Sequence, residues 1–167
     1  MNVRLNLCLL LTIASFSIAN AQHLPIYSGN SEISTAGLFD AGRTEFSFRY
    51  GRYIDHLVQM GFYVNFEDSS FYTRTALGAL FTRSFDTPTY LIPYVGAGLG
   101  YGQIERGGED NTGIELTFLL GLRYFISNNV SLNGEFHAGV SSDDTFLDNA
   151  EVDSVGMGFR FGLSYSW

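Results

Sequence analysis

Residues 154–167, SVGMGFRFGLSYSW, alternate without exception between two classes of side chain. The odd positions carry large apolar residues: Val155, Met157, Phe159, Phe161, Leu163, Tyr165 and Trp167. The even positions carry glycine, serine or Arg160. A period of two indicates a β-strand with one apolar face. Strands of soluble proteins usually have about 5 to 6 residues. The length of this pattern therefore favours a membrane-crossing strand, with a soluble β-sandwich as the alternative.

The same alternation recurs throughout the preceding chain and predicts seven more strands. They are expected at residues 31–39, 43–53, 57–67, 71–83, 91–102, 114–124 and 130–140. Within the predicted strand 114–124, Leu119 is the exception, a large apolar residue on the lumen side. Short connections at 54–56, 84–88 and 127–129 alternate with the segments 40–42, 68–70, 104–112 and 142–153. We therefore predict an all-β fold, an eight-stranded antiparallel up-and-down transmembrane β-barrel over residues 31–167.

Four glycines, Gly96, Gly98, Gly100 and Gly102, share one face of the predicted strand 91–102. Glycines at this density would destabilise a helix. In a narrow barrel they leave room for long side chains from opposite strands. A dinucleotide-binding glycine loop is the competing interpretation, but it requires a helix directly afterwards, and no such pattern follows.

Residues 1–21 predict a signal peptide. Arg4 precedes an apolar run over residues 5–18, and Ala19-Asn20-Ala21 forms a small-x-small cleavage pattern. We expect cleavage after Ala21 and a short N-terminal periplasmic segment over residues 22–30. The only cysteine, Cys8, lies in the apolar run. The mature chain then has no disulfide, no thiolate metal site and no cysteine nucleophile.

The sequence contains no lysine and has a formal net charge of -8, so nucleic acid is not an expected partner. Residues 142–153 form the densest acidic stretch, and carboxylates can bind Ca²⁺ or Mg²⁺. The acidic residues of this stretch do not have the spacing of a helix-loop-helix calcium site. We expect a solvated loop, no metal site and no cofactor; a cation that bridges this loop to lipopolysaccharide phosphates is a weaker hypothesis.

Charged side chains occur on the faces predicted to line the barrel interior. They are Glu45, Arg49, Arg74, Glu115, Arg123, Glu135, His137 and Arg160. Buried charges are tolerated when they are paired and hydrogen-bonded, and eight strands enclose a space that side chains can fill. We predict a structural network of ion pairs, with a narrow or gated solute channel as the alternative.

Aromatic residues recur along the predicted strands and beside them. They are Tyr50, Tyr53, Phe62, Phe71, Tyr101, Tyr124, Phe125, Tyr165 and Trp167. Aromatic side chains gather at both membrane interfaces of transmembrane barrels. We expect this location for them rather than a sugar-stacking site.

Three segments resemble small outer-membrane β-barrels of the kind that includes OmpA-like transmembrane domains. They are residues 93–102 (PYVGAGLGYG), residues 121–132 (GLRYFISNNVSL) and the aromatic C-terminus, residues 165–167 (YSW). The resemblance covers about residues 31–167. It implies a monomer in the outer membrane, with periplasmic termini, in contact with outer-membrane lipids and lipopolysaccharide.

The resemblance also implies that the closing strand is recognised by the outer-membrane assembly machinery, through Phe161, Leu163, Tyr165 and Trp167. Phenylalanine is the commoner terminal residue in the family, so Trp167 is a variant. The resemblance leaves the activity open, because one fold can serve many functions. We expect a role in envelope structure or in surface interaction through the external loops.

Some similar barrels deacylate lipid A with a His, a Ser and an acidic residue. Here His137 and Ser141 would lie about 13 Å apart along one strand, too far for the hydrogen bond that activates a nucleophile. The family pattern places these residues two apart, and residue 139 is Gly. We therefore predict no enzymatic activity, with a lipid A-modifying outer-membrane enzyme as the less favoured alternative.

Overall fold

The structure is a computed structural model that describes residues 26–40, 43–148 and 151–167. The predicted signal peptide, its cleavage site and most of the segment 22–30 lie outside these residues. No helix among the described residues is long and apolar enough to cross a membrane.

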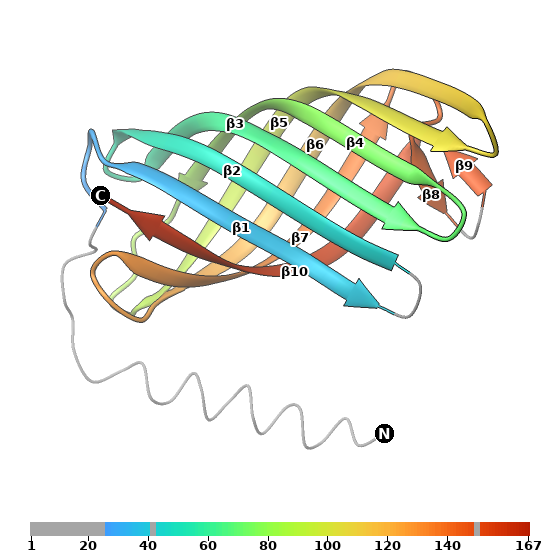
Figure 1. The fold of residues 1–167 in the computed structure, drawn as a ribbon. Helices are drawn as coiled ribbons and strands as arrows, with labels where there is room; N and C mark the ends of the chain where they lie inside the picture. Colours follow the sequence, from blue (N-terminus) through green and yellow to red (C-terminus); the bar gives the residue numbers. More distant parts are fainter. Residues whose placement is uncertain (1–25, 41–42, 149–150) are drawn as a thin grey trace.

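The described residues form ten β-strands, eight of which close into a barrel (Figure 1). The strands are β1 (Ser31–Asp40), β2 (Arg43–Asp55), β3 (Val58–Ser69), β4 (Thr73–Ser84), β5 (Leu91–Arg106), β6 (Glu109–Phe125), β7 (Val130–Ser141), β8 (Phe146–Asp148), β9 (Glu151–Asp153) and β10 (Val155–Ser166). Their order around the barrel is β1-β10-β7-β6-β5-β4-β3-β2, and all neighbours are antiparallel. The predicted eight-stranded up-and-down barrel is confirmed.

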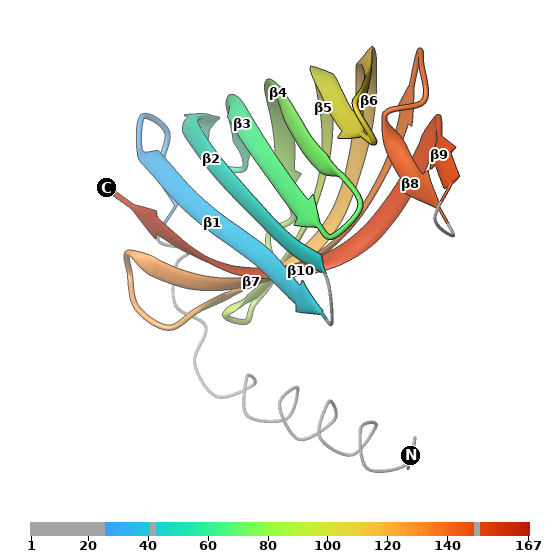
Figure 2. The same ribbon diagram turned by 45° about the vertical axis from the view of Figure 1, so that its right-hand side comes forward.

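The two ends of the barrel differ. The turn end contains the C-terminus and the short connections after β2, β4 and β6. The loop end contains the end of β1 and the connections after β3, β5 and β7, and β8 and β9 lie there (Figure 2). Two expected boundaries were wrong: β5 and β6 extend through the predicted loop 104–112, and β8 and β9 lie within the predicted loop 142–153. Gly107 and Gly108 make the tight β5–β6 turn with φ of 63° and 88°, which glycine adopts without strain.

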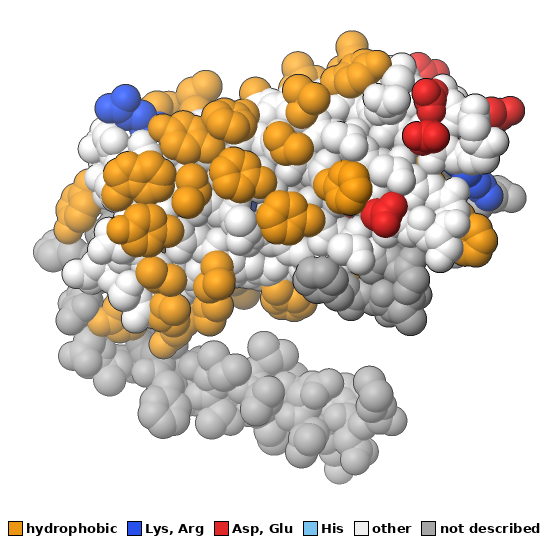
Figure 3. Space-filling view, in the orientation of Figure 1, with side chains coloured by type: hydrophobic (Ala, Val, Ile, Leu, Met, Phe, Trp, Pro, Cys, Tyr) orange, Lys and Arg blue, Asp and Glu red, His pale blue; other side chains and the backbone are white. Residues whose placement is uncertain are grey.

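The outer surface is a belt of exposed apolar side chains around the barrel (Figure 3). On β6 the belt runs from Ile114 to Tyr124 on alternate positions. Ten residue steps correspond to ~34 Å of strand, and a tilt of ~40° reduces this to a height of ~25 Å. This matches the hydrocarbon band of an outer-membrane barrel. Acidic side chains gather at the loop end, beyond the belt (Figure 3).

An apolar cluster closes the inside of the turn end. Ile26, Tyr53, Ile92 and Phe125 are buried together, and Tyr90 packs against them. Tyr53 and Phe125 were predicted to lie at the membrane interface, and that prediction is wrong for both. They occupy inward positions of β2 and β6, in phase with Arg49 and Arg123, and so complete the core. Leu119 faces inward as predicted.

Candidate functional site: the polar lumen

The lumen contains three clusters of buried charged groups, stacked from the turn end to the loop end. In the first cluster, Arg123 on β6 donates from Nη2 to Glu32 Oε1 of β1 at 2.8 Å. Arg123 also donates to the Tyr53 hydroxyl, which donates to Glu32 Oε2 at 3.0 Å. These three residues form a closed ring of hydrogen bonds beside the apolar cluster, to which Tyr53 also belongs.

Asn133 on β7 extends the first cluster to β10. Its Oδ1 accepts from Arg123 Nε at 3.2 Å, and its Nδ2 donates to Ser164 Oγ at 2.5 Å. Glu32 and Arg123 are both almost fully buried. Because each charge is paired and hydrogen-bonded, the cost of removing it from water is offset.

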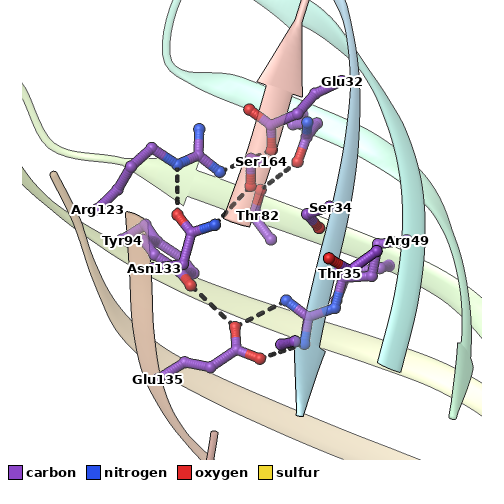
Figure 4. Close-up of a pocket in the computed structure, with 13 residues that line it drawn as sticks. Glu32, Ser34, Thr35, Arg49, Thr82, Tyr94, Arg123, Asn133, Glu135 and Ser164 are labelled. Carbon is purple, nitrogen blue, oxygen red and sulfur yellow. Dashed lines mark hydrogen bonds and ion pairs between the residues drawn. The ribbon is translucent and has the colours of Figure 1, made fainter. Parts of the chain in front are cut away.

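The second cluster is centred on Glu135 of β7, halfway along the lumen. Arg49 donates to both carboxylate oxygens, at 2.7 Å from Nη1 and 2.5 Å from Nη2. The Tyr94 hydroxyl donates to Oε2 at 2.8 Å, and Arg160 Nε donates to Oε1. Figure 4 shows the Arg49 and Tyr94 bonds converging on this carboxylate from different walls. Glu135 therefore ties four strands, β2, β5, β7 and β10, across the barrel.

Arg160 connects Glu135 to the loop-side half of the lumen. Its Nη1 lies 3.6 Å from Glu45 Oε1 and donates to Asn65 Oδ1 at 3.4 Å. His137 Nε2 lies 3.9 Å from the same Glu45 oxygen. His137 Nδ1 is buried without a hydrogen-bond partner among the described residues.

The third cluster closes the loop end. Arg74 Nη2 lies 2.7 Å from both oxygens of Glu115, and Arg74 Nε donates to the Thr145 carbonyl oxygen at 2.7 Å. The Thr145 hydroxyl donates to Glu115 Oε1 at 2.7 Å. The Arg74 guanidinium also lies 4.5 Å from the centre of the Phe146 ring, a favourable cation–π distance. Residues 145–146 thus plug the mouth of the barrel from above.

Glycines on the inner wall make room for these side chains. A Cβ on Gly121 would lie 2.6 Å from Tyr94 Cε1, and one on Gly139 would lie 2.8 Å from Phe146 Cζ. On β5, a Cβ on Gly98 would lie 3.1 Å from Tyr63 Cε1. The inward glycines of β5, predicted from the sequence to provide space, do face bulky side chains from other strands.

The structure brings all eight predicted luminal residues inside the barrel, where they join the three clusters. Sequence reasoning missed Glu32 and Glu67, which are equally buried. Glu32 lies in the strand with the weakest alternation, and Glu67 is the last residue of the predicted strand 57–67. Glu32 lies two residues from Ser34 on β1, and Glu67 lies two residues from Asn65 on β3. The alternation of the strands could therefore have predicted that both glutamates face the lumen.

Little free space remains between these side chains. The cavity beside Glu32, Arg49 and Glu135 measures about 20 Å³, and the cavity beside Glu45, Arg74 and His137 measures about 30 Å³. A buried water needs about 10–15 Å³ of such volume. Each cavity therefore accommodates roughly one to three water molecules.

Among the residues that the structure describes, no cluster is placed to hold a metal ion, and Ser141 and His137 are not arranged as a catalytic pair. Within residues 26–40, 43–148 and 151–167, no group of three or more His, Cys, Asp or Glu is placed to hold a metal ion. The predicted acidic loop 142–153 falls partly outside these ranges. Ser141 Oγ accepts a hydrogen bond from the Asp143 amide at 3.4 Å, whereas His137 Nε2 faces Glu45. Ser141 and His137 share no hydrogen bond in the described part of the chain.

Comparison with known proteins identifies the fold. No protein-family model and no curated protein matches the sequence. Among solved structures, the chain is similar to Neisserial surface protein A, with 20% identity over 81% of this chain and 94% of that one, at a TM-score of 0.61. The chain has the fold of the small eight-stranded outer-membrane β-barrels.

Two further membrane barrels match across nearly their whole length. One is a de novo designed transmembrane β-barrel, with 16% identity over 84% of this chain and 97% of the design, at a TM-score of 0.58. The other is the outer membrane protein OprG from Pseudomonas aeruginosa, with 10% identity over 86% of this chain and 99% of OprG, at a TM-score of 0.57. The predicted resemblance is therefore confirmed at the level of fold, and the soluble sandwich is set aside.

Proposed function

We propose that this protein is a non-enzymatic, integral component of a cell outer membrane. Its lumen is a structural network rather than a solute path, and its specific role lies in envelope structure or in surface interaction through the loop end. The fold and the continuous apolar belt support the membrane location. The turn end, with both ends of the barrel domain, then faces the periplasm, and the acidic loop end faces outward.

The observation that carries this proposal is the arrangement around Glu135. Two arginines and a tyrosine from three other strands converge on this one buried carboxylate at the middle of the barrel. The apolar cluster seals the turn end below it, and residues 145–146 seal the loop end above it. A conducting path would have to break all three layers, which favours a structural lumen over the narrow channel.

The outer surface supports the proposed partners. The outward side chains of β10 and of the residue that follows it are all about half exposed or more: Phe161, Leu163, Tyr165 and Trp167. They present a continuous apolar and aromatic face to outer-membrane lipids and to the assembly machinery. At the loop end, exposed acids such as Asp68, Glu105 and Asp110 would contact lipopolysaccharide through bridging cations. We propose a monomer, because the barrel closes on itself without a partner.

Planar-bilayer recordings of the refolded protein test the structural lumen. We expect no conductance steps from the wild-type barrel or from an Arg106→Gln control on the exposed β5–β6 turn. An Arg160→Met variant removes one of the two arginines that bind Glu135, and any leakage through the lumen should increase in it. Regular conductance steps from the wild-type protein that differ in the Arg160→Met variant would instead establish a channel. A change in the mass spectrum of lipid A in cells that express the protein would establish lipid A-modifying activity.

A further inference from the structure

Two arginines, Arg52 and Arg83, lie on the outer face of the barrel near its turn end. Both side chains are exposed, on outward positions of β2 and β4. The four luminal arginines each bind a carboxylate, whereas Arg52 and Arg83 make no hydrogen bond or ion pair with any described residue. The charge of Asp55 reaches Arg83 without direct contact, and that carboxylate is hydrogen-bonded to His56. Both cations are therefore available to an external anion.

An aromatic group beside these arginines marks the edge of the membrane. The ring centroids of Phe62 and Trp167 lie 5.4 Å and 6.5 Å from that of Tyr50. Aromatic rings of transmembrane barrels gather at the level of the lipid headgroups. Arg52 is the next outward residue after Tyr50 toward the turn end, so its guanidinium lies in the headgroup layer. Figure 3 shows a basic side chain at this end of the belt and acidic side chains at the other.

The strand register places the two arginines within reach of one headgroup. Arg52 lies opposite Met60 of β3, and Met60 lies opposite Phe81 of β4, two residues before Arg83. Two strand spacings of ~4.8 Å and two residue steps of ~3.4 Å separate the two arginine Cα atoms by roughly 12 Å. Long arginine side chains can converge across this distance, and their planar forks bind phosphate through paired hydrogen bonds. Met60 and Phe81 are exposed between them and offer an apolar surface to acyl chains.

We propose that Arg52 and Arg83 bind the phosphate of an anionic phospholipid, such as phosphatidylglycerol, in the periplasmic leaflet. This site rests on the proposed function, which places the turn end of the barrel in that leaflet. The phosphates of lipopolysaccharide belong to the opposite leaflet, at the loop end, where exposed acids such as Glu105 and Asp110 lie instead. Each arginine near an anionic lipid surface raises the affinity about fivefold. The barrel therefore gathers anionic phospholipid against β2, β3 and β4.

Fluorescence quenching by brominated lipids tests this site. The reporter is Met60→Trp combined with Trp167→Phe, which puts the only tryptophan between the two arginines. The protein is folded into phosphatidylcholine vesicles that contain either phosphatidylglycerol or phosphatidylcholine with brominated acyl chains. We expect brominated phosphatidylglycerol to quench more strongly. Its advantage should fall about fivefold in Arg52→Gln or Arg83→Gln and about 25-fold in the double variant, whereas the Arg106→Gln control at the loop end should leave it unchanged.

Failure of the lipid site and failure of the membrane location give different results in this assay. Equal quenching by the two brominated lipids, or an advantage that survives in the double variant, would overturn the phosphate site and leave the barrel in the membrane. Quenching by neither lipid would show that residue 60 does not face lipid, which would contradict the membrane location and the phosphate site together. Heat-dependent gel mobility of the same variants shows separately whether the barrel has folded.

Discussion

Neutralising Glu135 should destabilise the barrel more than any change to an exposed charge. In Glu135→Gln, the side chain keeps its size but loses its charge and one of its two acceptor oxygens. Arg49 and Arg160 then remain buried without the carboxylate that both of them bind. The amide NH₂ of the glutamine also lies against arginine N–H groups, so that hydrogen-bond donors face donors. Removal of one partner from a buried ion pair typically costs about 3–5 kcal/mol. That loss corresponds to roughly a 10²- to 10⁴-fold change in the folding equilibrium.

Urea unfolding in lipid vesicles measures this loss. The fluorescence of Trp167, the only tryptophan, reports insertion because its side chain lies half exposed on the outer face. Glu105→Gln, on the exposed part of β5, is the control and should shift stability by no more than about 0.5 kcal/mol. If Glu135→Gln and Glu105→Gln unfold at the same urea concentration, the central cluster does not hold the barrel together, and the reasoning is refuted.

Three further substitutions test other parts of the structure. Gly121→Ala places a Cβ against the Tyr94 ring and should lower the free energy of unfolding by roughly 1–3 kcal/mol, measured by the same urea assay. Gly134→Ala is the control and should be nearly neutral, because its Cβ would meet only the edge of the Phe161 ring at 3.3 Å. Phe146→Ala should lose about 3–5 kcal/mol but remain non-conducting in planar bilayers, because the Glu135 cluster still blocks the lumen. Trp167→Ala should slow assembly into the outer membrane in a pulse-chase experiment, whereas Trp167→Phe should assemble normally; equal rates would remove residue 167 from the assembly signal.

The sequence predicts the strands well where one face meets lipid and the other meets the packed lumen. Residues 154–167 alternate completely because both conditions hold along the whole strand. The strands predicted for the β5–β6 hairpin were too short, because polar residues such as Gln103 and Thr112 face outward beyond the belt. Outward side chains there are in water and need not be apolar, so the alternation is lost. Tyr53 and Phe125 were misplaced because an aromatic ring suits both an interface and a core.

The polar residues of the lumen could be predicted one by one, but their partners could not. Arg49 and Glu135 are 86 positions apart, and their contact depends on the register of every strand between them. The plug formed by residues 145–146 lies at the start of β8, a strand of three residues that is too short for its periodicity to indicate where the side chains point.

Gel mobility in outer-membrane fractions tests the central claim most directly, namely that this chain is a closed barrel in the outer membrane. Samples are compared with and without boiling in detergent. We predict that the protein is found in the outer-membrane fraction and that it migrates differently after boiling, since the closed ladder and the buried ion pairs resist detergent until they are heated. A soluble periplasmic protein with the same mobility before and after boiling would contradict the account.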